Sequence, residues 1–229
     1  LNNQVSFENP ENLSKETFRS LIHSHVNRNS WGSFGIDIAL GSVIDRDINP
    51  EYYMFLPSYI NTFFDVAKKS NGEKLVISET ELNQGIDKKH TSSFFFSPLF
   101  ILGILGFLIV YITFKDYKNN KRTKWLDFVL FTITGIIGII LLLLWFATDH
   151  SATAHNYNLL WAFPLNLFIG FSLLKKTQRQ WVKKYLKLLV ILLCLMTLHW
   201  IIGIQVFAIG LIPLLIAFAI RYIYLIRIV

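Results

Sequence analysis

Five long apolar segments follow one another in the second part of the chain, and they constrain the fold more than any other feature. About 20 helical residues cross a hydrocarbon core of roughly 30 Å. Residues 188–220 hold no charged side chain, and as one helix they would be too long for a bilayer, so we expect a turn near Gly203 and Gly210. The third segment is shorter than the others and contains Pro164 and Asn166. We therefore predict an α-helical membrane protein whose five transmembrane helices occupy about residues 94–114, 126–147, 159–174, 188–202 and 207–226.

The charged residues divide unequally between the two parts of the chain. Residues 1–93 hold nine Lys or Arg and twelve Asp or Glu, whereas residues 94–229 hold thirteen Lys or Arg and three Asp, a net charge of +10. All thirteen cations fall on one side of the predicted spans, and the positive-inside rule makes that side cytoplasmic. We expect a multi-pass protein of the bacterial inner (cytoplasmic) membrane, with residues 1–93 in the periplasm and the C-terminus in the cytoplasm. The positive net charge of residues 94–229 is explained by this orientation and indicates no nucleic-acid partner.

Residues 1–93 have mixed character. Apolar residues at helical spacing behind Ser14 predict a helix over about 15–27, and Pro57 opens a second predicted helix. Residues 74–81 read as a strand, and residues 31–45 fit neither period. Because the chain starts at Leu1 without a signal peptide, we expect a fragment of a longer protein, with residues 1–93 forming a partial, mainly helical α+β domain.

The loop predicted between the second and third spans concentrates polar groups at the external membrane surface. Histidine titrates near neutral pH, so His150 and His155 are candidates for binding a phosphate headgroup or assisting proton transfer. The alternative is a solvated hairpin whose Asp and Asn side chains cap the adjoining helices. A metal site would require Asp149 and both histidines to converge, and we predict neither a metal ion nor a cofactor. The candidate supporting residues of this loop are Asp149, His150, His155, Asn156 and Asn158.

Three further residues stand among apolar neighbours. Asp37 needs a partner for its carboxylate, either as a helix cap or to orient a catalytic histidine. His199 lies within the fourth predicted span, where we favour a neutral imidazole hydrogen-bonded between helices over a functional group. Cys194 is the lone cysteine, which excludes disulfides, and we expect it to be a packing residue rather than a nucleophile.

Three segments of the chain resemble the Lnb family, the bacterial lipoprotein N-acyltransferases. They are WGSFGIDIALG at 31–41, MFLP at 54–57 and TDHSATAHNYNLLWA at 148–162. The resemblance covers essentially the whole chain. It implies the end of a papain-like periplasmic domain followed by a five-helix membrane domain, which agrees with the helix count predicted from hydropathy alone.

The resemblance also implies a reaction. In such enzymes a cysteine oriented by a histidine takes an acyl chain from a phospholipid as a thioester, and the N-terminal cysteine amine of a lipoprotein then receives the chain. The partners implied are a membrane phospholipid and a lipoprotein substrate. The family's nucleophile lies in an Asn-Cys-(Ala or Ser)-Thr-Arg type motif and its histidine in a Gly-His motif, and neither motif occurs in this sequence. No catalytic residue can therefore be assigned, and we expect the chain alone to be inactive.

Three hypotheses follow for the function. The leading one is the C-terminal membrane part of an Lnb-like acyltransferase, whose spans and loop position lipid substrates. The alternative is a non-enzymatic membrane anchor or partner-binding protein with a periplasmic domain. A transporter is disfavoured, because the spans hold few ionisable residues and show no internal repeat.

Overall fold

The computed structural model describes residues 5–8, 10, 13–80, 82, 93–175 and 179–229. The chain forms two compact units. One, the small unit, comprises Leu1–His25 and Arg46–Thr91, and the other, the bundle unit, comprises Val26–Asp45 and Ser92–Val229. The domain boundary expected at Ser93 lies close to one of these divisions. Residues 26–45 differ from the expectation, since they group with the apolar helices rather than with the rest of the N-terminal segment.

The small unit has a core of three buried side chains, Leu21, Tyr53 and Phe63. The hydroxyl of Tyr53 donates to the carbonyl of Ser14 at 2.9 Å and accepts from the amide of Glu16 at 2.8 Å, which ties the chain before the first helix to the core. The elements are β1 (Val5–Ser6), α1 (Phe18–His25), a 3-10 helix (Pro50–Phe55), α3 (Pro57–Asp65) and β2 (Lys68–Lys69), and the two strands pair antiparallel with Val5 opposite Lys69.

Both helices predicted in this region form, although α1 is shorter than expected. The strand predicted over 74–81 is wrong in the described part, and Glu81 lies outside the described residues. The chain turns at Gly72, where φ is +85°, and Lys74 forms only an isolated bridge with Lys68. Ile77 is 90% exposed, so the apolar run that suggested a strand packs on no core.

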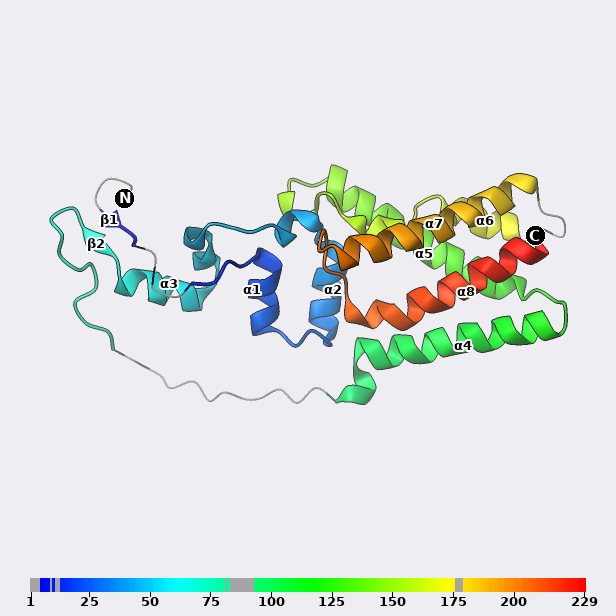
Figure 1. Ribbon diagram of the computed structural model, residues 1–229, viewed down its shortest axis with the longest axis horizontal. Helices are drawn as coiled ribbons and strands as arrows, with labels where there is room; N and C mark the ends of the chain where they lie inside the picture. Colours follow the sequence, from blue (N-terminus) through cyan, green and yellow to red (C-terminus); the bar gives the residue numbers. More distant parts are fainter. Residues whose placement is uncertain (1–4, 9, 11–12, 81, 83–92, 176–178) are drawn as a thin grey trace. The chain divides into compact units, whose positions relative to one another are not determined.

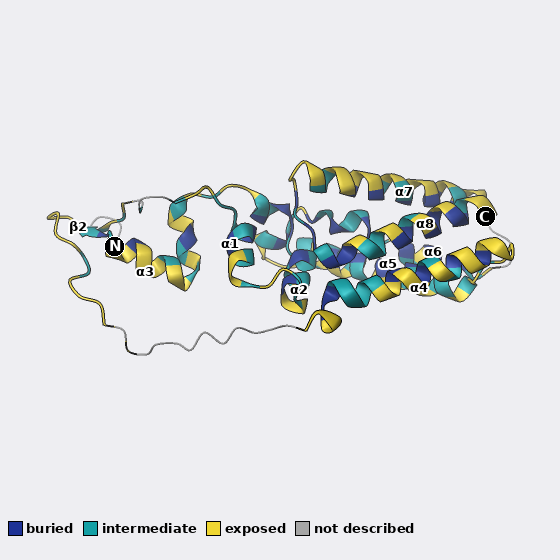
Figure 2. Ribbon diagram, turned by 60° about the horizontal axis from the view of Figure 1, so that its bottom comes forward, coloured by how far each residue is buried: buried dark blue, intermediate teal, exposed yellow. Residues whose placement is uncertain are grey.

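Four helices of the bundle unit are long and apolar enough to cross a membrane among the residues that the structure describes. They are α4 (Pro98–Lys118), α5 (Lys124–Phe146), α7 (Gln180–Ile201) and α8 (Ile212–Ile228), and they lie side by side in Figure 1. Their outward faces carry exposed large apolar side chains (Figure 2), the reverse of a soluble surface. The protein is therefore a multi-pass membrane protein.

The third predicted span differs from the expectation. Its helical part, α6 (Asn166–Leu173), has 8 residues and a length of about 12 Å, too short to cross a bilayer. The preceding residues contain only two short 3-10 helices, Ser151–Thr153 and Tyr157–Leu160. The count of five transmembrane helices is thus not confirmed. Trp161 and Ala162 are nonetheless buried, which is how irregular backbone is tolerated at membrane depth.

Two glycines of α5 allow this irregular segment to approach closely. A Cβ atom at Gly138 would lie 2.1 Å from the carbonyl oxygen of Ala162, and one at Gly135 would lie 2.3 Å from the amide nitrogen of Leu167. Small residues at helix contacts permit such backbone-to-backbone packing in membranes. As a result α5 packs mainly on α6, whereas α4 packs mainly on α8.

A buried ionic network closes one end of the bundle, which we call the Arg221 end. Arg221 is 0% exposed, and its Nε and Nη1 atoms donate to Asp127 Oδ1 and Asp116 Oδ2, both at 2.7 Å. Arg122 Nε lies 3.7 Å from Asp127 Oδ2. Burial lowers the pKa of Arg122 below its ordinary value, and the attraction of Asp127 opposes that shift. The sequence analysis counted Arg221 among the cations at the cytoplasmic end of the last predicted span, and the structure shows it as an internal counter-ion of α8.

Candidate functional site

The short helix α2 (Trp31–Ala39) lies at the end of the bundle opposite Arg221, which we call the α2 end (Figure 1). Ser30 begins the helix as its N-cap by accepting from the amide of Ser33 at 3.2 Å. The indole of Trp31 donates to the carbonyl of Phe96 at 2.8 Å, and the amide of Leu99 donates to Asn29 Oδ1 at 3.1 Å. These bonds attach both α2 and the turn before it to the start of α4.

Two buried asparagines hold the last carbonyls of α2. Asn156 Nδ2 donates to Ile38 at 2.8 Å and to Ala39 at 3.0 Å, and Asn158 Nδ2 donates to Asp37 at 2.9 Å. The final carbonyls of a helix have no partner within the helix; the amide of Leu40 bonds the carbonyl of Ile36, and the two asparagines bond the three carbonyls that follow. Asn158 Oδ1 in turn accepts from the indole of Trp161 at 2.9 Å.

Gln205 completes this group, which we call the amide cluster (Asn156, Asn158 and Gln205). Its side chain accepts from the amide of Tyr157 at 2.8 Å and donates to the carbonyl of Leu40 at 3.4 Å. The sequence indicated only a turn at Gln205. A buried amide among apolar residues needs hydrogen-bond partners. This requirement was the one signal in the sequence that Gln205 bonds to other polar groups such as Asn156 and Asn158.

The chain after α2 is fixed to the same loop by its backbone. The amide of Gly41 donates to the carbonyl of Ala152 at 2.9 Å, and the amide of Ser42 donates to the carbonyl of His155 at 3.1 Å. A Cβ atom at Gly41 would lie 1.9 Å from the carbonyl oxygen of Ala154, so glycine is required for this approach. Two of the segments that carry the family resemblance thus meet at the α2 end.

The structure brings together three of the six predicted site residues. Asp37, Asn156 and Asn158 are buried at the α2 end, where Asn158 bonds the backbone carbonyl of Asp37. Asp149 and His150 are exposed. Among the described residues, no three His, Cys, Asp or Glu side chains lie close enough together to hold a metal ion.

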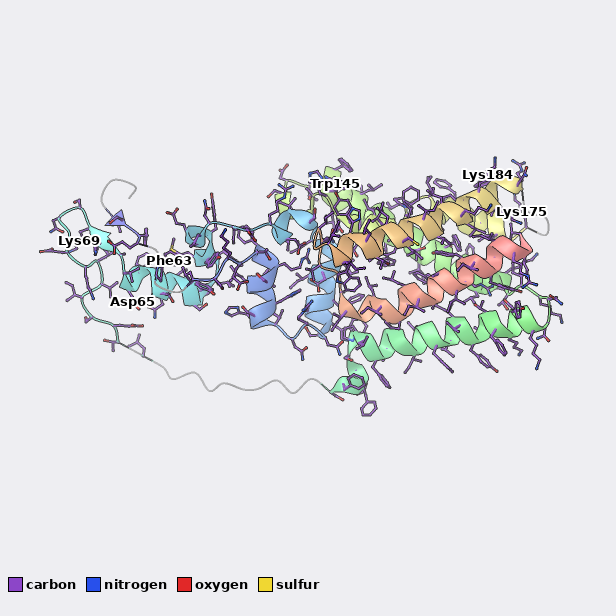
Figure 3. The ribbon with its side chains drawn as sticks, viewed as in Figure 1. Phe63, Asp65, Lys69, Trp145, Lys175 and Lys184 are labelled. Atoms are coloured by element: carbon purple, nitrogen blue, oxygen red, sulfur yellow. The ribbon has the colours of Figure 1, made fainter. Side chains whose placement is uncertain are left out.

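His155 differs from the other loop residues in its backbone. It has a φ of +53°, and its exposed ring lies 5.1 Å from that of Trp145. Figure 3 places Trp145 at the α2 end and Lys175 and Lys184 at the opposite end. The imidazole is therefore presented at one extremity of the bundle, away from the cationic residues.

An apolar groove runs between α4 and α5 from this end. Its volume is about 510 Å³, and we call it the α4–α5 groove. Trp161, Leu211, Leu214 and Phe218 border it as well, and Phe34 and Ile38 of α2 contribute to its lining, so the amide cluster holds the helix that completes the groove. The sequence analysis did not predict this groove, since hydropathy identifies spans but not which of them fail to pack together.

Two residues of α7 lie outside this site. The ring of His199 packs 4.6 Å from that of Tyr157, and its Nδ1 lies 2.8 Å from the carbonyl of Leu195 in its own helix. We expected a bond between helices, and the bond given is within α7. Cys194 is exposed on the helix surface, so it is not the buried packing residue that we expected.

Replacing Asn158 with alanine is expected to release the end of α2. Each buried polar group left without a partner costs about 1–3 kcal/mol, and the change removes the bonds to Asp37 and to the Trp161 indole. We expect a lower thermal unfolding midpoint in detergent and faster amide hydrogen exchange at residues 37–42. Asn119→Ala, at an exposed position, is the matched control and should change stability by less than about 0.5 kcal/mol. Unchanged exchange in the Asn158 variant would contradict the capping role.

Comparison with known proteins identifies the bundle unit. A family model described as the Lnb transmembrane domain matches residues 89–229, more than half of the chain. No curated protein and no solved structure matches the chain.

Proposed function

The chain belongs to the Lnb family, and on that premise we propose that it is the membrane part of an enzyme that acylates lipoproteins. The proposed reaction transfers an acyl chain from a membrane phospholipid to the α-amine of the N-terminal cysteine of a lipoprotein. Both substrates are anchored in lipid, so the reacting groups must meet at the membrane surface. A protein that holds them there converts an encounter between two molecules into a reaction within one complex.

The arrangement of the α2 end is the observation that best supports this function. The loop at 148–158 is fixed to α2 by the amide cluster and by the backbone of Gly41, yet Asp149, His150 and His155 stay exposed. This loop with its exposed polar groups, which we call the polar platform, is bonded to α2, and Phe34 and Ile38 of α2 line the apolar groove. The polar platform suits contact with a phospholipid headgroup, and the apolar groove suits contact with an acyl chain.

We assign to this chain the positioning of substrates and not the covalent chemistry. In the family, a thiolate paired with histidine attacks the phospholipid ester to form the thioester, and the lipoprotein amine then displaces the thiol. The family's cysteine and histidine motifs do not occur in these residues. Cys194 is a poor substitute because a thiol facing lipid lacks the water and the base that form a thiolate.

The proposed orientation puts the α2 end in the periplasm and the Arg221 end in the cytoplasm. The described cations of residues 94–229 outside the buried network support it, since they lie near the ends of the membrane-spanning helices at the Arg221 end. They are Lys115, Lys118, Lys121, Lys124, Lys175, Arg179, Lys183, Lys184, Lys187 and Arg227. This orientation exposes the platform to lipoproteins after their export.

The proposed function is tested in cells that carry the intact protein. We expect the N-terminal peptide of a lipoprotein to gain the mass of one amide-linked acyl chain, and to lack it when the gene is deleted. The double variant His150→Ala/His155→Ala should lower this acylation several-fold with an unchanged unfolding midpoint, because both rings are exposed. Ser151→Ala, also exposed in the same loop, is the control. Identical lipoprotein masses with and without the gene would favour a non-enzymatic anchor.

A further inference from the structure

We propose that the α4–α5 groove holds a single acyl chain of a membrane phospholipid, with the headgroup at the α2 end. This inference deepens the proposed function and rests on it for the role of that phospholipid as acyl donor. The occupancy itself is argued from the shape, the lining and the size of the groove.

The walls of the groove are aliphatic faces with helical spacing. Residues three, four or seven positions apart share one side of a helix. On α4 they are Leu102, Leu105, Leu108, Ile109 and Ile112, and on α5 they are Leu126, Val129, Leu130, Ile133, Thr134 and Ile137. Among the described lining residues, only Thr134 and the indole of Trp161 carry polar side-chain atoms, and both are already hydrogen-bonded within the protein. The groove therefore offers contacts to hydrocarbon and no free hydrogen-bonding group to a peptide.

The groove is more than the ordinary lipid-facing surface of two helices. Its walls stay apart because α4 packs mainly on α8 and α5 mainly on α6. Buried side chains also line it, since Ile109, Trp161 and Phe218 are each at most 5% exposed. The indole of Trp161 is fixed by its bond to Asn158, so this lining is preorganised by the amide cluster. Preorganisation lowers the cost of binding.

The dimensions fit one chain. From Leu102 to Ile112 the groove follows α4 for about 15 Å, half of a hydrocarbon core of roughly 30 Å. A transmembrane helix needs about 30 Å to cross that core, twice the length of the groove along α4. The groove is therefore too short to seat a transmembrane helix along its whole length, and it matches the depth of one membrane leaflet.

The residues at the α2 end indicate which way a phospholipid lies in the groove. Phe34 and Ile38, one helical turn apart on α2, line the groove, and exposed Asp149, His150 and His155 lie on the loop that is bonded to this helix. Toward the opposite end the lining reaches Ile112 and Leu126, and the carboxylates of the Arg221 network beyond them are already paired with arginine. A phospholipid chain in the groove therefore places its ester group next to the polar platform.

Photo-crosslinking tests the occupancy on the intact protein in vesicles of phosphatidylethanolamine and phosphatidylglycerol. The probe is a phosphatidylethanolamine that carries a diazirine within one acyl chain. We expect mass spectrometry to find labels concentrated on Ile109 and Leu130 rather than on the outward Phe107, with excess unlabelled phospholipid reducing them. Equal labelling of groove and outward faces would overturn the proposal, as would preferential labelling by a lipoprotein with the diazirine in its diacylglyceryl chains.

Matched tryptophan variants sharpen the test. Ile133 lines the groove and is 52% exposed, whereas Ile136 lies on the same helix, is 46% exposed and does not line it. Ile133→Trp should lower the labelling of Leu130 at least fivefold, and Ile136→Trp should leave it unchanged. Leu105→Trp and Ile104→Trp repeat the comparison on α4 at equal exposures of 45%. Because all four residues are partly exposed, we expect each variant to fold, and its unfolding midpoint checks this. Equal changes in labelling within both pairs would contradict the proposal.

Measuring lipoprotein acylation with the same variants separates this inference from the proposed function. Selective groove labelling by a protein that acylates no lipoprotein supports the groove and contradicts the acyltransferase. Acylation that continues with unselective labelling supports the acyltransferase and overturns the groove. Loss of both labelling and acylation in Ile133→Trp, but not in Ile136→Trp, links the groove to the acyl donor.

Discussion

Replacing Arg221 with methionine is expected to destabilise the bundle by about 3–5 kcal/mol, the range measured when one partner of a buried ion pair is removed. The guanidinium bridges Asp116 of α4 and Asp127 of α5 at 2.7 Å each. Its loss leaves two buried carboxylates, of which Asp116 keeps the hydrogen bonds from the Thr123 amide and hydroxyl and Asp127 keeps Arg122 at 3.7 Å. We expect a much lower unfolding midpoint in detergent and a lower yield of folded protein.

Two controls distinguish a missing counter-ion from a missing side chain. Arg227→Met removes an exposed arginine of the same helix, whose guanidinium lies 5.1 Å from the ring centre of Tyr117, and should cost at most about 1 kcal/mol. Adding Asp116→Asn and Asp127→Asn to the Arg221 variant removes the uncompensated charges, so part of the stability should return. An Arg221 variant as stable as the Arg227 variant would show that the network contributes little.

Replacing Gly138 with alanine should also destabilise the bundle strongly, by about 1–3 kcal/mol, through overpacking. The new Cβ would lie 2.1 Å from the Ala162 carbonyl oxygen and 2.8 Å from the Pro164 nitrogen, so the irregular segment must move off α5. Trp161 lies in that segment and lines the groove. We therefore expect both a lower unfolding midpoint and a change in the fluorescence of that tryptophan.

Gly103→Ala is the matched control for this change. Gly103 is also inside a membrane-spanning helix, but no atom lies within 4 Å of a Cβ built there. Alanine favours helix over glycine by up to about 1 kcal/mol, so the control should be neutral or stabilising. A Gly138 variant that behaves like the Gly103 variant would mean that the irregular segment is not packed against α5 as described.

Hydropathy predicted four of the membrane-spanning helices because the signal is local to each helix. The first was expected at 94–114 and forms at Pro98–Lys118, where Ser97 as N-cap and Pro98 begin it. The third predicted span is not confirmed, since only the 8-residue helix α6 forms there, and an apolar run also results when a chain is buried inside protein. Asn166 interrupts that run, and its side chain bonds Thr134 and Tyr185, contacts that no local pattern reveals.

The site could be predicted only as far as its polar loop. Asn156 and Asn158 were identified as polar residues in a loop between two apolar segments. Their partners on α2 lie more than 100 residues away in the chain. The role of Arg221 was missed for a related reason. A cation near the end of a span reads as a surface anchor, and only its approach to Asp116 and Asp127 across three helices shows that it is internal.

The order in which the helices pair has a consequence for the synthesis of the protein. Among the four described membrane-spanning helices α4 is made before the others, yet its main partner is α8, which is made after them. Until residue 221 has been made, Asp116 and Asp127 lack the arginine that bridges them. Ribosomes add about 5–20 residues per second, so α4 waits in the translocation machinery or the bilayer for several seconds. A chain that stops before α8 should therefore keep two carboxylates without their arginine and hold α4 and α5 together less stably.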